Sequence, residues 1–119
     1  MLDDEAPVRK ATERLLRSAG MDVEVYATGA EFLAALATSQ ADCLILDLQM
    51  PDLNGFEIQD RINASGSRLP VVIVTGNDTP EARARAMAAG SVAVLLKPVH
   101  ERELLDAIAL AIAGRAAGP

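Results

Sequence analysis

The chain has 119 residues, a length typical of one domain, and half of them are apolar. Its 17 acidic and 11 basic side chains give a formal net charge of −6, whereas nucleic-acid-binding domains usually carry a basic surface. One cysteine, Cys43, and one histidine, His100, exclude an internal disulfide and a Cys/His zinc site. No apolar run reaches the length of a membrane span, and no signal-peptide pattern opens the chain. We therefore expect a cytoplasmic globular domain that binds neither nucleic acid nor a membrane.

Four short segments rich in β-branched residues predict strands. Three of them are nearly continuous apolar runs, which is typical of strands that are covered on both faces in a parallel sheet. In chain order, the predicted strands are residues 23–27, 43–48, 71–75 and 92–96.

Segments with helical spacing alternate with these strands. Pro7 follows acidic residues at a position that suits the first helical turn, and Thr79 precedes Pro80 as a helix cap. Gly20 and Gly90 follow helical patterns and end them. The predicted helices are residues 7–19, 30–37, 56–64 and 80–89, and a last helix from about Glu101.

Regular alternation of strands and helices with short connections predicts an α/β fold with a doubly wound parallel sheet flanked by helices on both faces. We assign residues 1–113 to one domain and residues 114–119 to a linker-like tail. In such sheets, ligands bind outside the carboxyl ends of the strands, which is therefore where a functional site is expected.

Polar side chains gather at these strand ends. Asp3 and Asp4 precede the first helix, and Asp47 lies near the end of one apolar run. Thr75 ends the next run, and Lys97 follows the last one. Clustered carboxylates repel one another, and Mg²⁺ relieves this repulsion while leaving coordination positions for water and phosphate oxygens. A carboxylate at such a site can act as a nucleophile toward phosphorus, and Lys97 and Thr75 would then bind the phosphoryl oxygens.

The motifs at these positions resemble those of the response-regulator receiver domain of two-component signalling. They are Asp3-Asp4-Glu5, the segment 47–55 that begins with Asp47, Thr75-Gly76 and Lys97-Pro98. The resemblance covers essentially the whole chain, with the motifs in the family's order. Each motif alone is common, and the set together is specific.

The resemblance implies a role for each matched residue. Asp47 would accept the phosphoryl group, Asp4 would bind Mg²⁺ directly, and Asp3 would bind it through water. The main-chain carbonyl of Gln49 would complete the protein ligands. Thr75 and Lys97 would form a switch pair, with a cis peptide bond between Lys97 and its following proline.

The resemblance also implies the function. The domain would be a phosphorylation-operated switch that takes a phosphoryl group from a histidine kinase or phosphotransfer protein and acts on an effector domain or partner protein. It would not be an enzyme beyond catalysing its own aspartyl phosphorylation and dephosphorylation. One alternative is a receiver-like interaction module that no longer switches by phosphorylation. A phosphatase similar to haloacid dehalogenases is disfavoured, because Gln49 stands where those enzymes have a second aspartate.

The individual residues also have simpler interpretations. Asp3 and Asp4 could only stabilise the start of a helix, by about 0.3–1 kcal/mol each. Thr75 could be an ordinary residue at a strand end, and Lys97 a surface lysine.

Two features depart from the family pattern. Val94 occupies a position where the family usually has an aromatic residue. Only Met1 and Leu2 precede the acidic pair, where the family has its central first strand. We therefore expect four parallel strands with a gap beside residues 23–27 and a loose terminus that weakens the Mg²⁺ site. The open edge would favour a homodimer. We also expect the natural protein to begin about five or six residues earlier.

Overall fold

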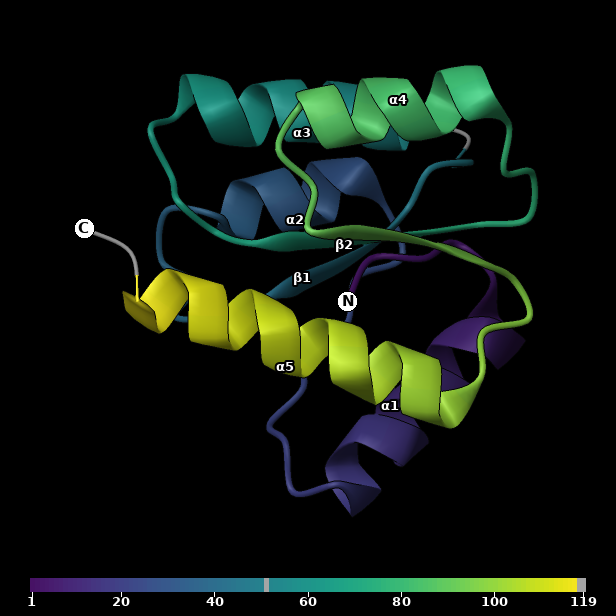
Figure 1. Cartoon of the computed structure of the whole chain (residues 1–119). Coiled ribbons are helices and arrows are strands. Elements are labelled where there is room, and N and C mark those ends of the chain that lie inside the picture. The colour runs from purple at the N-terminus through teal and green to yellow at the C-terminus, as the bar shows by residue number, and fades with distance from the viewer. Residues whose placement is uncertain (51, 118–119) are drawn as a thin grey trace.

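The computed structural model of the chain describes residues 1–50 and 52–117, and a parallel sheet lies at its centre (Figure 1). Its strands are β1 (Leu44–Asp47), β2 (Val71–Thr75) and β3 (Ala93–Leu96), in this spatial order. Ile73, in the middle of β2, pairs with Leu46 on one side and with Val94 on the other. Every residue of β2 is buried, as expected for a strand with neighbours on both sides and helices on both faces. These strands confirm three of the four predicted ones.

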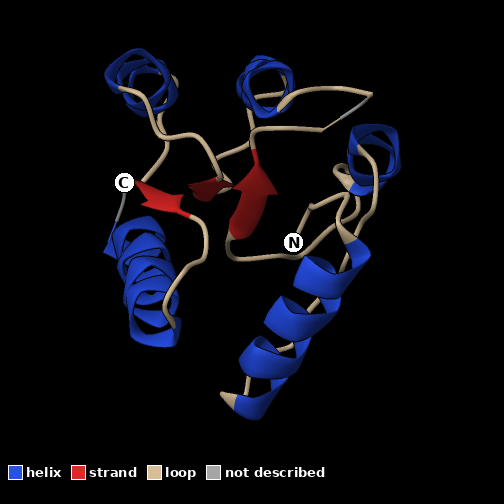
Figure 2. Ribbon diagram, turned by 90° about the vertical axis from the view of Figure 1, so that its right-hand side faces the viewer, coloured by secondary structure: helices blue, strands red, loops and turns tan. Residues whose placement is uncertain are grey.

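Within the described residues, five helices cover the two faces of the sheet (Figures 1 and 2). α1 (Ala6–Ser18) and α5 (Glu101–Ala117) lie on one face, and α2 (Gly29–Ala35), α3 (Gly55–Ala64) and α4 (Pro80–Ala88) lie on the other. All five were predicted, with boundaries within two residues wherever both ends were assigned. The arrangement confirms the doubly wound α/β fold.

Successive residues of each strand pack into two different cores. In β1, the side chain of Leu46 packs with α2 and α3, whereas that of Ile45 packs with α1 and α5. This alternation follows from strand geometry, since consecutive side chains point to opposite faces of a sheet. It explains why the strands are apolar at successive positions up to their polar ends, because helices cover both faces of the sheet.

Polar side chains define the starts of three helices. Thr28, Asn54 and Thr79 each accept a hydrogen bond from the main-chain N–H three residues further on, which stabilises a helix start. α1 differs, because Glu5 at its cap position makes no such side-chain bond. The beginning of α1 is therefore held by other contacts, which involve the candidate site.

The predicted strand at residues 23–27 is absent from the structure. Within this segment only Tyr26 forms a bridge. The expected four-stranded core is therefore wrong. The expected gap and loose terminus are wrong as well, since Leu2 lies between Tyr26 and Leu46 and bridges both in parallel. The Leu2 N–H donates to Ile45 O at 2.8 Å. The Tyr26 N–H donates to Met1 O at 2.9 Å. A few residues thus occupy the central position in the sheet, but they are too few to support a strand at 23–27.

A cavity of about 660 Å³ lies beside this short central segment. Met1 and Ile45 line it, together with Leu16, which is the one buried residue of α1. The face of the sheet beside Met1 and Leu16 is therefore incompletely packed. The predicted association of two copies through this edge stays a prediction.

The contact between α3 and α4 includes polar groups. Asn63 Nδ2 donates to Ala89 O at 3.0 Å, and Gln59 Nε2 donates to Ala86 O at 3.4 Å. Gln59 Oε1 is buried and has no hydrogen-bond partner among the described residues. One acceptor is thus left unsatisfied inside this interface.

The last helix, α5, continues to Ala117, so residues 114–117 of the predicted tail are helical, and residues 118–119 lie outside the described part. The domain boundary itself stays a prediction. None of the helices in the described residues combines the length and the apolar character that crossing a bilayer requires.

Candidate functional site

Asp47 is the last residue of β1 and is only 2% exposed. Its N–H donates to Leu2 O at 3.0 Å, which joins it to the short central segment. Its Oδ1 accepts the Gln49 N–H at 3.0 Å, and its Oδ2 accepts a hydrogen bond from Lys97 Nζ at 3.3 Å. The carboxylate is thus buried, oriented from two sides and placed at the carboxyl edge of the sheet, where function was predicted.

Lys97 reaches the same place from β3. Its N–H donates to Thr75 O at 2.8 Å, which fixes the start of the turn after β3. Its ammonium lies 2.9 Å from Asp3 Oδ2 and 3.4 Å from Glu5 Oε1, in addition to its contact with Asp47. One cation is therefore shared by three carboxylates, and the peptide bond after Lys97 is cis, as predicted.

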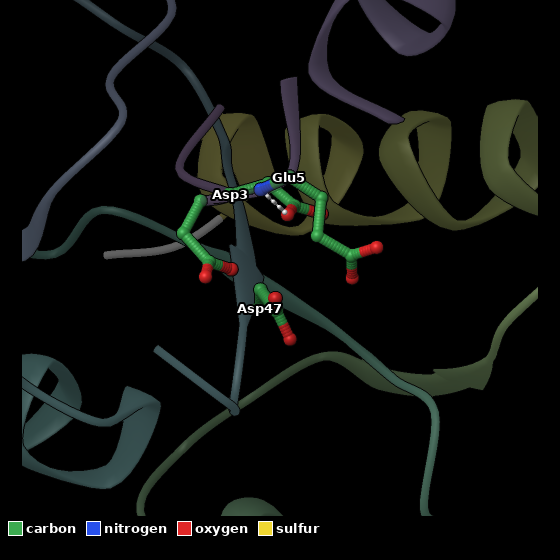
Figure 3. Close-up of side chains that lie close together, drawn as sticks. Asp3, Glu5 and Asp47 are labelled. Atoms are coloured by element: carbon green, nitrogen blue, oxygen red, sulfur yellow. Dashed lines mark hydrogen bonds between the residues drawn. The ribbon is translucent and has the colours of Figure 1, made fainter. Parts of the chain in front are cut away.

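Asp3 is fully buried, although it lies close to the terminus. Its N–H donates to Tyr26 O at 3.2 Å, and its Oδ1 accepts the Glu5 N–H at 2.9 Å, the bond drawn in Figure 3. Arg9 Nη1 donates to its main-chain carbonyl at 2.8 Å. Burial with these bonds explains why the terminus is ordered, in contrast to the expectation from the sequence.

Four carboxylates converge at this edge. In Figure 3, the side chains of Asp3 and Glu5 extend toward that of Asp47. One carboxylate oxygen from each of Asp3, Asp4, Glu5 and Asp47 lies within 4.8 Å of the others, with Asp3 and Asp47 buried and the other two exposed. Such a set of oxygen atoms suits a hard divalent cation such as Mg²⁺. The position of the Lys97 ammonium supports this fit, because a positive charge already lies among the carboxylates.

Burial raises the pKa of Asp47 from 3.8 to about 6, and the nearby Asp3 also raises it. The hydrogen bond from Gln49 and the charge of Lys97 act in the opposite direction and are too weak to cancel the effect. Burial alone would lower the pKa of Lys97, but the hydrogen bond to Asp3 and the charge of Asp47 raise it. Lys97 therefore stays protonated, while Asp47 remains a carboxylate that a further cation would stabilise.

The other predicted residues lie nearby without joining the carboxylate cluster directly. Thr75 ends β2 beside β1 and is buried, and its Oγ1 accepts the Asn77 N–H at 3.1 Å. Gln49 is exposed and contacts Asp47 through its main-chain N–H. Glu5 belongs to the acidic motif but was not predicted as a site residue, and no motif indicated Arg9. An acidic residue directly after the Asp pair was an available signal for Glu5, whereas the Arg9 contact depends on where α1 packs.

The close approach of Gly55 supports the position of Asp47. A Cβ atom on Gly55 would lie 2.8 Å from Leu48 Cα and 3.0 Å from Asp47 O. Since these are main-chain atoms, a side chain at residue 55 would push against the end of β1. The start of α3 thus lies directly against the segment that carries the buried carboxylate.

Comparisons with known proteins identify the family of the chain. The family model of the response regulator receiver domain matches residues 1–109. The chain is 35% identical over 112 residues to the response regulator protein TodT of Pseudomonas putida, covering 94% of this chain and 49% of that protein. It is 38% identical over 112 residues to the tetrathionate response regulatory protein TtrR of Salmonella typhimurium, covering 94% and 54%. The chain therefore spans about half the length of these relatives.

Solved structures agree on the fold. The receiver domain of the Francisella response regulator 1452 superposes with a TM-score of 0.90 at 24% identity, covering 96% of this chain and 94% of that one, a likeness that shows the fold alone. FixJ-N superposes with a TM-score of 0.88 at 30% identity, covering 94% and 90%. Receiver domains are signalling modules rather than classical enzymes. The fold, the family model and the relatives together show that this chain belongs to the response-regulator receiver domain family of two-component systems.

Proposed function

We propose that this receiver domain is a phosphorylation-operated switch in which Asp47 accepts a phosphoryl group from a histidine kinase or phosphotransfer protein in a Mg²⁺-dependent step. The observation that carries the proposal is the buried Asp47 carboxylate, which shares Lys97 with Asp3 and lies among four converging carboxylates. A cytoplasmic location and an effector domain or partner protein as the target of the switch belong to the same proposal.

The transfer is a displacement at phosphorus. An Asp47 carboxylate oxygen forms a bond to phosphorus while the bond from phosphorus to the donor imidazole nitrogen breaks, and the imidazole takes up a proton. Hydrolysis of the resulting acyl phosphate releases inorganic phosphate and restores the carboxylate. The domain catalyses these two steps on itself and acts on no separate substrate.

The cation would be held by Asp3, Asp4 and Asp47, with the main-chain carbonyl of Gln49 completing the protein ligands. When bound, Mg²⁺ neutralises charge on the phosphoryl oxygens. Glu5 is a further candidate ligand, because its carboxylate belongs to the same cluster. The raised pKa of Asp47 supports the need for a cation, since this carboxylate loses stability when it is ionised in its buried position.

Lys97 and Thr75 would detect the added group. Phosphorylation adds about −1.5 to −2 charges at pH 7, which the Lys97 ammonium can bind through the phosphoryl oxygens. Lys97 would then shift its contact away from Asp3 toward the new group. Because the Lys97 main chain is bonded to Thr75 O, a shift at one strand end is passed to the next.

The decisive experiment is phosphorylation with phosphoramidate in the presence of Mg²⁺, followed by intact-mass measurement. We expect the wild-type chain to gain one phosphoryl group and Asp47→Asn to gain none. Asp52→Asn is the matched control, because the Asp52 carboxylate accepts the N–H groups of Gly29 and Ala30 at the start of α2 instead of joining the cluster. Phosphorylation of Asp47→Asn at the wild-type rate would refute the assignment. A wild-type chain that gains no phosphoryl group would favour the non-switching interaction module.

Mg²⁺ titration tests the metal site separately. We expect Asp4→Asn and Asp47→Asn to weaken Mg²⁺ affinity and Asp52→Asn to leave it unchanged. Affinity should also fall as the pH drops below about 6, because Asp47 then takes up a proton. Calorimetry between pH 5 and 8 measures both effects. An equal loss in the Asp52 variant would place the metal in the loop after β1.

A further inference from the structure

Arg9 connects α1 to the peptide group that joins the two aspartates of the site. It is half-buried in α1, and its Nη1 donates to the main-chain carbonyl of Asp3 at 2.8 Å. That carbonyl belongs to the peptide between Asp3 and Asp4. The orientation of this peptide plane sets the directions in which the two carboxylates point, so a bond to its oxygen acts on both.

The cap position of α1 supplies no side-chain bond of its own, so the bond from Arg9 adds to the few that hold the start of this helix. Glu5, the cap residue, provides no side-chain hydrogen bond to the first turn, and Pro7 has no N–H to donate. Leu2 is held by one bridge on each side, and its neighbour Met1 lines the cavity described above. Arg9 therefore adds a side-chain bond from α1 to a turn whose other bonds involve Tyr26, Glu5 and Lys97.

The charge of Arg9 would have the opposite effect on a bound cation. A guanidinium one peptide group away from the carboxylate cluster repels Mg²⁺, so loss of this charge by itself would strengthen binding. If the hydrogen bond matters more than the charge, removing Arg9 weakens binding instead. The sign of the change in affinity thus separates the two effects.

We propose that Arg9 is a positioning residue for the cation site. It holds the Asp3–Asp4 peptide so that both carboxylates face Asp47, and this effect exceeds the repulsion from its own charge. The role rests on the proposed function, since it concerns the Mg²⁺ site. An arginine suits it because the planar guanidinium is pre-organised for a hydrogen bond at a defined angle, whereas a lysine ammonium on a flexible stem is not.

The first measurement is Mg²⁺ affinity of the full chain by calorimetry. We expect Arg9→Ala to weaken Mg²⁺ binding by about tenfold, the lower end of the effects seen when a residue that orients metal ligands is removed. Arg9→Lys, which keeps the charge, should recover part of the loss. Lys10→Ala is the control, because Lys10 is the exposed neighbour with the same charge, and its removal should leave affinity unchanged or slightly stronger. Unchanged or stronger binding in Arg9→Ala would overturn the role.

The second measurement needs no metal. The Glu5 N–H donates to Asp3 Oδ1, so its exchange with solvent, followed by NMR, reports the order of the acidic turn. We expect Arg9→Ala to speed hydrogen exchange at the Glu5 N–H and to leave exchange at the Val72 N–H in β2 unchanged. Weaker Mg²⁺ binding without faster exchange at Glu5 would overturn positioning as the cause. If Arg9→Ala does not fold, Arg9→Gln, which keeps a donor on a shorter side chain, takes its place with the same expected directions.

The failures of the two proposals can be told apart. A wild-type chain that binds no Mg²⁺ would overturn the metal-dependent function, and the role of Arg9 with it. Wild-type binding that Arg9→Ala matches would overturn the role of Arg9 alone.

Discussion

Two parts of the sheet differ in how much backbone pairing holds them. One is the pair of strands β2 and β3, and the other is the short segment Met1–Asp3. β2 and β3 share four residue pairs, whereas Leu2 forms a single bridge on each side. The helices differ in the same way, because α5 contributes several residues to the core and α1 buries only Leu16.

The candidate site lies across the boundary between these two regions. Asp47 and Lys97 are carried by the paired strands, whereas Asp3 is carried by the short central segment. The Lys97–Asp3 ion pair joins residues 94 positions apart in the chain. The better supported region thus carries Asp47 and Lys97, and the less supported region carries the remaining carboxylates. Changes in the less supported region should therefore affect the proposed metal binding more than they affect folding.

The largest expected effect comes from shortening one leucine on each side of this boundary. Leu46 in β1 is fully buried, so Leu46→Ala should lower the free energy of unfolding by about 2–5 kcal/mol. Leu16→Ala should lower the free energy of unfolding less, because Leu16 already lines a cavity and shortening it removes fewer contacts. Urea unfolding measures both. Equal losses would mean that α1 is packed as tightly as the strands.

The pH dependence of stability tests the burial of Asp47. Its pKa is raised from 3.8 to about 6 in the folded state, so the folded chain binds a proton more tightly than the unfolded chain. The contribution of protonated Asp47 to the free energy of unfolding is fully present below about pH 4 and is lost as the pH rises through 6. With about 1.4 kcal/mol per pKa unit, the loss is about 3 kcal/mol.

Asp47→Asn removes this loss, since the amide does not titrate. The difference in unfolding free energy between the variant and the wild type should therefore grow by about 3 kcal/mol from pH 4 to pH 7, in the absence of metal. Urea unfolding at several pH values measures it. Parallel profiles for the two chains would show that Asp47 has an ordinary pKa.

The stability cost of an added methyl group should differ, by a smaller amount, between Gly55 and Gly29. Gly55→Ala places a methyl group against main-chain atoms of Leu48 and Asp47 and should cost about 1–3 kcal/mol. Gly29→Ala meets only side-chain atoms, Ile58 Cδ1 at 2.8 Å and Leu53 Cβ at 3.1 Å, and should cost less than Gly55→Ala because no main-chain atom has to move. Thermal unfolding compares the two. A larger loss for Gly29 would show that the region beside Tyr26 is the more rigid one.

A small effect is also expected at Val94, which pairs with Ile73 and is 4% exposed. Val94→Ala removes two methyl groups and should lower the unfolding free energy by about 1 kcal/mol. Phosphorylation of Asp47 should change little, because Val94 packs in the core and makes none of the contacts of Asp47 described above. A large loss of phosphorylation-dependent response in a stable variant would give this position a role in the switch.

The parts of the fold that the sequence predicted are those with a local signal. The apolar runs around Leu46, Ile73 and Val94 identified the strands, because strands buried on both faces are apolar at successive positions. Asp47 and Lys97 followed from their places after such runs. These residues needed no knowledge of distant partners.

The errors occurred where the outcome depended on partners elsewhere in the chain. Residues 23–27 have strand composition, but a strand needs neighbouring backbone, and Leu2 provides only a bridge to Tyr26. Asp3 was expected on a loose terminus. Instead it is fully buried and accepts hydrogen bonds from Lys97, Glu5 and Arg9. A sequence read locally does not contain these contacts, since Lys97 is almost the whole chain away.

The unsatisfied acceptor in the α3–α4 interface marks a position where the natural sequence is short of its greatest stability. Gln59 Oε1 is buried without a partner among the described residues, a state that costs about 1–3 kcal/mol. The amide nitrogen of Gln59 donates to Ala86 O, which also accepts the Ser91 N–H at 3.1 Å and would stay satisfied without the Gln59 bond. A methionine of similar length at this position would remove the unsatisfied oxygen and keep the packing. Selection maintains proteins above a threshold of stability and does not drive them to an optimum. The interior of this interface is one place where a substitution could still raise the stability of the chain.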